Sequence, residues 1–193
     1  MNDGWYEVVH APPLTQGDLI FECPVVGWKA TATVIGDAGG ELLRAATEVI
    51  RADVVVMTQA CDLMHRKVTN VIVCPHVSLT EYHALWVQEM QERNQRPTAK
   101  AWDGHCRDIR DGFLWNLSIM NEYQGEPLKM THRIVDFHDV YTIPLAFLEV
   151  VSTQRRQSWL RFRPPYRENL SQAFARFFMR VGLPVPVSEL PAM

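Results

Sequence analysis

The sequence predicts a mainly β fold with helices, in which a small β-barrel carries a helical insertion and a C-terminal amphipathic helix. Residues 53–58 and 70–74 predict the strands, because both are runs of β-branched and apolar residues of strand length. The helices are predicted by the capping-box spacing of Ser78 and Glu81 and by a wide apolar stripe at helical spacing over residues 166–181.

The composition is that of a folded globular chain. Of the 193 residues, 47% are hydrophobic and 21% are charged, which is more apolar than a disordered chain. The longest apolar runs, such as residues 54–57, have about four residues, whereas a membrane-spanning helix needs roughly 20. Residues 1–4 are polar and acidic, unlike a secretory signal. We therefore expect a single domain over residues 1–193 that is cytoplasmic and does not bind membranes.

The elements follow in order along the chain. Residues 19–21 predict a short buried strand that ends at Cys23-Pro24, and a glycine-rich turn follows at 36–40. Residues 79–129 read as an insertion, whose helix begins after Ser78 and ends before a proline. Further strands are predicted over residues 113–120, 133–143 and 159–163.

The C-terminal part, residues 154–193, is predicted to form a strand and then the amphipathic helix. We assign a partner-binding face on this helix to Phe174, Phe177, Phe178, Arg176 and Arg180. The alternative is that the apolar stripe packs on the barrel as ordinary core.

The charge is distributed unevenly along the chain. The formal net charge is −3, yet the segment from Val150 onward carries seven arginines and two acidic residues, and the remainder carries 12 basic and 20 acidic residues. A basic tail on an acidic body favours docking against the protein itself or a protein partner. The overall acidic balance argues against a dedicated binder of double-stranded nucleic acid.

The loop between the two strongest strands is a polar cluster with a possible functional role, formed by Thr58, Gln59, Cys61 and Asp62. In one interpretation Cys61 is a nucleophile, with His65 or His76 as its base and Asp62 as the orienting group. In the other, the polar side chains hydrogen-bond the loop backbone and the cysteine packs inward.

The four cysteines form no Cys-x-x-Cys pair. Their spacing fits neither a zinc ribbon nor a zinc finger. We therefore predict reduced thiols, no metal and no cofactor, with a metal site assembled from distant segments as the alternative.

The order of these motifs resembles the MazF/PemK family of small SH3-like barrels. The matching segments are Gly17-Asp18-Leu19-Ile20, Arg51 to Met57, Val71 to Ser78, and Val140-Tyr141-Thr142-Ile143 with the helical stretch that follows it. The resemblance implies an SH3-like (MazF-like) barrel with its core in residues 15–78 and 130–153.

Many members of that family are endoribonucleases of toxin–antitoxin pairs, in which an arginine and a hydroxyl group act on the scissile phosphate. Carried over to this chain, the resemblance implies that Arg51 and Ser78 are the catalytic residues. Here the family's Arg-Pro pair is Arg51-Ala52, and its Glu-x-Gly-x-Arg-Pro loop is absent.

The altered motif, the acidic body and the C-terminal helix together predict a non-catalytic protein. We expect a regulatory or adaptor component of a bacterial stress or phage-defence system, toxin–antitoxin-like or CRISPR-associated, that binds a protein partner. The alternative is a MazF-type endoribonuclease toxin that cleaves single-stranded mRNA. RNA is therefore a second partner that the sequence allows, and a homodimer is compatible with it.

Overall fold

One antiparallel sheet organises the protein. The structure is a computed structural model that describes residues 4–29 and 40–179. In these residues the strand order is β1-β8-β2-β3-β4-β6-β5, with β7 pairing with β4 off this path. The strands are β1 (Tyr6–Val9), β2 (Asp18–Trp28), β3 (Thr47–Val56), β4 (Asn70–Ser78), β5 (Leu117–Met120), β6 (Arg133–Asp136), β7 (Tyr141–Pro144) and β8 (Trp159–Phe162).

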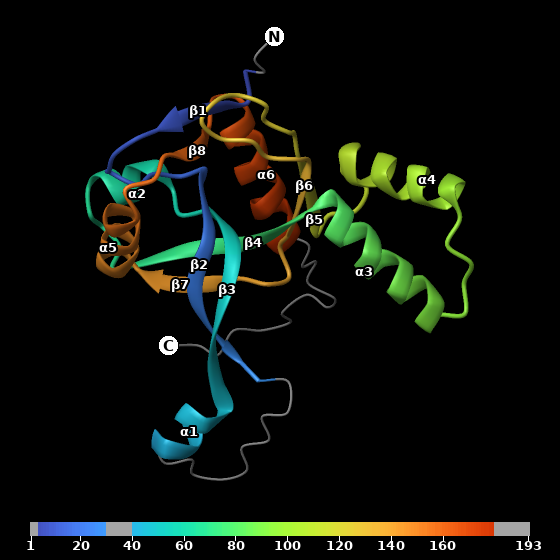
Figure 1. Ribbon diagram of the computed structural model, residues 1–193, viewed down its shortest axis with the longest axis horizontal. Helices are drawn as coiled ribbons and strands as arrows, with labels where there is room; N and C mark the ends of the chain where they lie inside the picture. Colours follow the sequence, from blue (N-terminus) through green and yellow to red (C-terminus); the bar gives the residue numbers. More distant parts are fainter. Residues whose placement is uncertain (1–3, 30–39, 180–193) are drawn as a thin grey trace, which may run out of the picture.

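Helices lie on both sides of the sheet and beyond its edge. They are α1 (Gly40–Ala46), α2 (Ala60–Met64), α3 (Leu79–Glu92), α4 (Ala99–Arg110), α5 (Leu145–Arg155) and α6 (Tyr166–Phe178). In Figure 1, α3 and α4 project to the right of the sheet, and β2 and β3 extend downward as a two-stranded arm that ends at α1.

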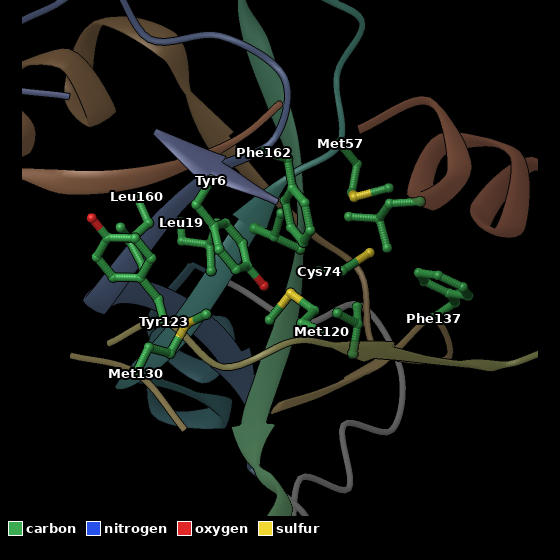
Figure 2. Close-up of a cluster of buried hydrophobic side chains, with 13 residues drawn as sticks. Tyr6, Leu19, Met57, Cys74, Met120, Tyr123, Met130, Phe137, Leu160 and Phe162 are labelled. Carbon is green, nitrogen blue, oxygen red and sulfur yellow. The ribbon is translucent and has the colours of Figure 1, made fainter. Parts of the chain in front are cut away.

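Both faces of the central strands are buried. Side chains alternate along β3, so Val54 and Val56 belong to one hydrophobic core and Val55 to the other. The first core, shown in Figure 2, is closed by Leu170 of α6. The second core receives Leu63 of α2 together with residues of α5. The continuous apolar runs in these strands follow from burial on two faces.

Strand β4 directs the topology, because it pairs with three other strands. Its first half pairs with β7, its middle pairs with β3, and its last three residues pair with β6. The register with β3 ends at Val54 opposite Pro75, where the proline has no N–H to donate. Beyond this point β4 continues into the pairing with β6, and β6 in turn pairs with β5.

The predicted mainly β architecture with helices is confirmed. The sheet, however, is open, because its path runs from β1 at one edge to β5 at the other. The capping box of Ser78 and Glu81 is present at the start of α3, and β8 and α6 occupy the predicted C-terminal positions.

Three local expectations differ from the structure. The strand expected at 133–143 is divided into β6 and β7, because the two pair with opposite ends of β4. Strand β2 continues through Pro24 to Trp28, since beyond Cys23 it pairs only with β3. The strand expected over residues 113–120 begins only at Leu117.

Candidate functional site

The predicted loop cluster lies where β3 leaves the sheet and α2 begins. Thr58 is buried, and its Oγ1 accepts a hydrogen bond from the backbone N–H of Ile72 at 2.7 Å. Gln59 is exposed at the N-cap of α2 and makes no side-chain capping bond. The cluster is therefore partly structural, with Thr58 tying the loop to β4, and partly exposed.

Cys61 is exposed beside groups that accept hydrogen bonds. Its Sγ lies 3.7 Å from Gln59 Oε1 and 3.7 Å from Asp62 Oδ1. A cysteine nucleophile needs a base or a cation to form its thiolate. His76, one of the two predicted bases, has other partners: Arg133 and the ring of Phe21. The hydrogen-bond partners of the Cys61 thiol are therefore acceptors, not a base or a cation.

A groove joins the loop cluster to helix α6. Its volume is about 920 Å³. Thr58, Gln59 and Asp62 line it, as do Phe174, Phe177 and Phe178 of α6. The two sets of residues that the sequence predicts separately therefore meet at one site. We call this site the loop–helix groove.

The phenylalanines of α6 connect the groove to the first core. Phe174 makes an edge contact with the buried ring of Phe137, with ring centroids 5.5 Å apart. Phe178 contacts both Phe174 and Phe177, each at 4.9 Å, yet is 54% exposed. The stripe therefore packs as core on one side and remains open on the other.

Arg176, one of the two predicted arginines of this face, is not among the residues that line the loop–helix groove. Arg176 lies over the ring of Trp115, 6.0 Å from its centroid. Arg180 lies outside the described residues. The ionisable residues that line the groove are Asp62 and His138, so its surface is mostly apolar and neutral.

Arg51 and Ser78, the residues implied by the MazF resemblance, have different partners. Arg51 is exposed on β3, and its Nη1 donates to the carbonyl oxygen of Glu22 at 3.2 Å. Ser78 Oγ accepts from the backbone N–H of Glu81 at 3.1 Å and donates to its carboxylate at 2.7 Å. These bonds lower the pKa of Glu81. Ser78 is thus engaged as a helix cap.

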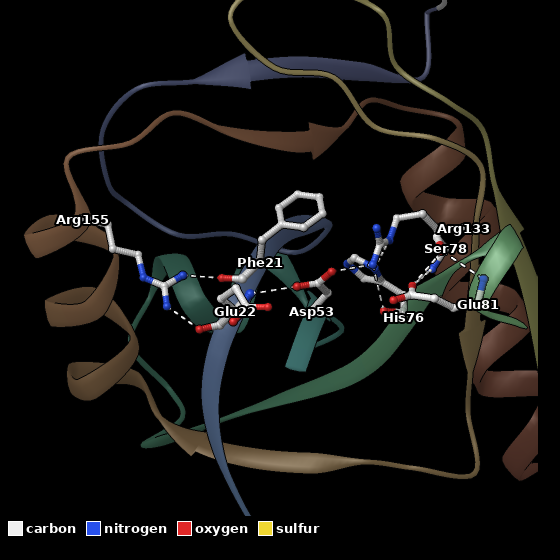
Figure 3. A network of polar contacts seen from close by, with 8 residues as sticks. All are labelled: Phe21, Glu22, Asp53, His76, Ser78, Glu81, Arg133 and Arg155. Atoms are coloured by element: carbon white, nitrogen blue, oxygen red, sulfur yellow. Dashed lines mark hydrogen bonds and ion pairs between the residues drawn. The ribbon is translucent and has the colours of Figure 1, made fainter. Parts of the chain in front are cut away.

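A buried polar network was missed by the sequence reasoning (Figure 3). Arg133 on β6 donates from Nε to His76 Nδ1 at 2.6 Å and from Nη2 to Asp53 Oδ2 at 2.5 Å. Asp53 Oδ1 accepts the backbone N–H of Glu22 at 2.8 Å. Arg155 of α5 donates to the carbonyl oxygens of Phe21 and Glu22.

The network fixes an irregularity of β2 rather than forming an open site. The register of β2 shifts between Ile20 and Cys23, and Glu22 has a positive φ of 50°. His76 is 2% exposed, and burial together with Arg133 holds its pKa well below the usual value. The sequence signal for this network is the polar Asp53 and His76 within the two strongest strands.

Two further kinds of feature, a metal site and a membrane-spanning helix, are absent from the described residues. These residues contain no group of three or more His, Cys, Asp or Glu side chains that could hold a metal ion. Nor is any helix in residues 4–29 or 40–179 long and apolar enough to cross a membrane.

Comparisons with known proteins found no relative of this chain, so its site is described from its own geometry. No protein-family model, curated protein or solved structure matches this chain.

Proposed function

We propose that this protein is a MazF-like, non-catalytic adaptor or regulatory component of a bacterial stress or phage-defence system, toxin–antitoxin-like or CRISPR-associated. The sequence resemblance supports the family assignment. In this resemblance β2, β3, β4 and β7 correspond to strands of an SH3-like barrel, although the sheet here is open. The four cysteines, all free, suit a protein of the cytoplasm.

The observation that carries the proposal is the loop–helix groove. It combines an apolar wall from α6 with polar side chains from the 58–62 loop. Grooves of this kind accept the apolar face of an amphipathic helix, with polar groups at the rim setting orientation. The occupant is therefore a helix of a partner protein.

The experiment is co-expression of the tagged chain with the products of neighbouring genes, followed by purification. We expect one product to co-purify in stoichiometric amount. Phe178→Asp places a charge in the groove and should weaken binding by about tenfold or more, the size of an interface hot spot. The matched control is Phe147→Asp, because Phe147 is also a partly exposed phenylalanine on a helix, at 45%, but lies outside the groove.

Two outcomes contradict the proposal. One is equal binding by the Phe178→Asp and Phe147→Asp variants, which would place the interface elsewhere. The other is a chain that binds none of these products but cleaves RNA.

The alternative is a MazF-type endoribonuclease, and one observation favours it. Arg51 donates a single hydrogen bond, to the carbonyl oxygen of Glu22, and makes no ion pair within the described part of the chain. Its remaining donors are available to a phosphate. The capping role of Ser78 opposes this alternative, because the hydroxyl is already bound to Glu81.

The nuclease alternative predicts growth arrest on expression and RNA cleavage by the purified chain. Arg51→Ala should abolish cleavage, whereas Arg44→Ala, at an exposed arginine of α1, should retain it. Cleavage that survives Arg51→Ala, or its absence in the parent chain, rejects the alternative.

A further inference from the structure

A second cavity lies where the helical insertion meets the rest of the protein. Its volume is about 520 Å³, within the range of small-molecule sites. Its walls come from α4, β5, α6, the end of β8 and the residues that precede β1 and β6. It shares no lining residue with the loop–helix groove, so it is a separate site from the one that carries the proposed function.

One wall of this cavity is flat and aromatic. The rings of Trp5 and Tyr166 are stacked, with centroids 4.2 Å apart and planes 15° from parallel. Phe162 lies beside them, 6.3 Å from Trp5. Because the two rings face each other, the pair leaves only an outer ring face on which a planar aromatic ring can stack, with gains in buried apolar area and stacking energy.

The same cavity presents polar side chains without partners. Those of Ser118, Asn121, His132 and Asn169 line it. Within residues 4–29 and 40–179, none of the four takes part in a side-chain hydrogen bond. Each asparagine amide offers both a donor and an acceptor. Several polar groups that converge on an apolar wall are typical of a ligand site.

The edge of the sheet adds a backbone donor and acceptor. Strand β5 is the last strand of the path. Asn116 accepts a hydrogen bond from Phe137 across the ladder, and Ser118 and Met120 lie opposite Val135 and Arg133. Because antiparallel residues alternate in direction, Ile119 turns its N–H and C=O away from β6. Ile119 also lines the cavity.

An arginine side chain, that of Arg110, also lines this cavity. Arg110 ends α4 and is exposed, and its Nε bonds Asp111 Oδ1 at 2.9 Å. The Nη groups of its guanidinium remain free to bind an anion such as phosphate. Arg110 is the one arginine among the described residues that line the cavity.

We propose that this cavity binds a mononucleotide. The base stacks on the Trp5–Tyr166 wall with its polar edge toward Ile119 and the asparagines, and Arg110 holds the phosphate. The cavity, at about 520 Å³, is of small-molecule size and contains one arginine, and the chain carries a net charge of −3. A polynucleotide would need a longer cationic track, so the ligand is a free nucleotide.

Calorimetric titration of the full chain with AMP, GMP, CMP and UMP, each in turn, tests this inference. We expect at least one to bind with a dissociation constant in the micromolar range. Arg110→Ala should weaken binding by about tenfold or more, because it removes a charge-assisted contact. Arg107→Ala is the matched control, since this exposed arginine of α4 does not line the cavity.

Asn169→Ala should weaken binding by about fivefold, with Gln172→Ala on the same helix as its control. The proposal is overturned if no nucleotide binds at millimolar concentration, or if each variant matches its control. It is also overturned if a short single-stranded RNA binds about tenfold more tightly than every mononucleotide, because the cavity would then belong to a strand-binding surface.

Discussion

Arg133 is the residue on which the centre of the sheet depends. It is 9% exposed, and it connects β6 to His76 of β4 and Asp53 of β3. Asp53 in turn holds the irregular part of β2 through the backbone of Glu22. Arg133 also lies over the ring of Phe21, 5.2 Å from its centroid. One side chain thus links four strands that are distant in the sequence.

Replacing Arg133 with Met should lower the free energy of unfolding by about 3 kcal/mol, because Asp53 would be left partly buried without its partner. Urea denaturation measures the change. Arg93→Met is the control: its ion pair with Glu89 lies on the surface of α3, and its loss should cost less than about 0.5 kcal/mol. Equal effects of the two variants would contradict the structural role of the network.

His76 should make the protein sensitive to mild acid. Its folded pKa lies well below 6.5, so below about pH 6.5 the unfolded chain binds a proton that the folded chain does not. The free energy of unfolding should therefore decrease as the pH is lowered, by at most about 1.4 kcal/mol per pH unit for this group. Partly buried His105 contributes with the same sign.

Urea denaturation from pH 7 to pH 5 tests this dependence. His76→Gln retains an acceptor for Arg133 and should flatten it more than His105→Gln does. If the free energy of unfolding of the His76→Gln variant depends on pH as strongly as that of the parent chain, the dependence belongs to other groups.

At the scale of elements, helices α3 and α6 differ in how they are stabilised. Helix α3 buries one residue, Trp86, so its capping box carries much of its local stability. Helix α6 has no side-chain cap and is anchored by packing, through Leu170 in the first core and Phe174 against Phe137.

Ser78→Ala should destabilise the protein by about 1 kcal/mol, the usual cost of losing an N-cap. Ser78→Asn preserves a capping acceptor and should restore most of this loss. The control is Thr80→Ala, at an exposed position in the first turn of the same helix. Thermal unfolding followed by circular dichroism measures all three, and an unaffected Ser78→Ala variant would refute the capping role and reopen a catalytic one.

At the scale of the whole molecule, the two ends of the chain complete the sheet. Strand β1 pairs with β8, and β8 pairs with β2. Leu160 and Phe162 of β8 are buried in the first core beside Tyr6. The N-terminal and C-terminal segments therefore form one structural unit with the central strands.

A chain that ends at Arg156 should lose cooperative unfolding, because it lacks an interior strand and the helix that covers the first core. Urea denaturation followed by tryptophan fluorescence tests this expectation. A chain that ends at Met179 keeps every described element and should unfold in a single transition. A cooperative transition in the shorter chain would mean that β2 to β7 fold without the tail.

Several local elements are predictable from the sequence alone. The apolar runs of β3 and β4, the capping box of α3 and the stripe of α6 are patterns within one segment, so propensity and periodicity are enough to predict them. The loop cluster at 58–62 and the phenylalanines of α6 were likewise predicted, but as two separate features.

How these features come together is visible only in the folded structure. The groove, the network around Arg133 and the cavity beside Trp5 each join segments far apart in the chain. Their geometry depends on strand pairing, above all on β4 passing from β7 and β3 to β6. No pattern within one segment encodes such pairing, because it is set by which buried surfaces fit together.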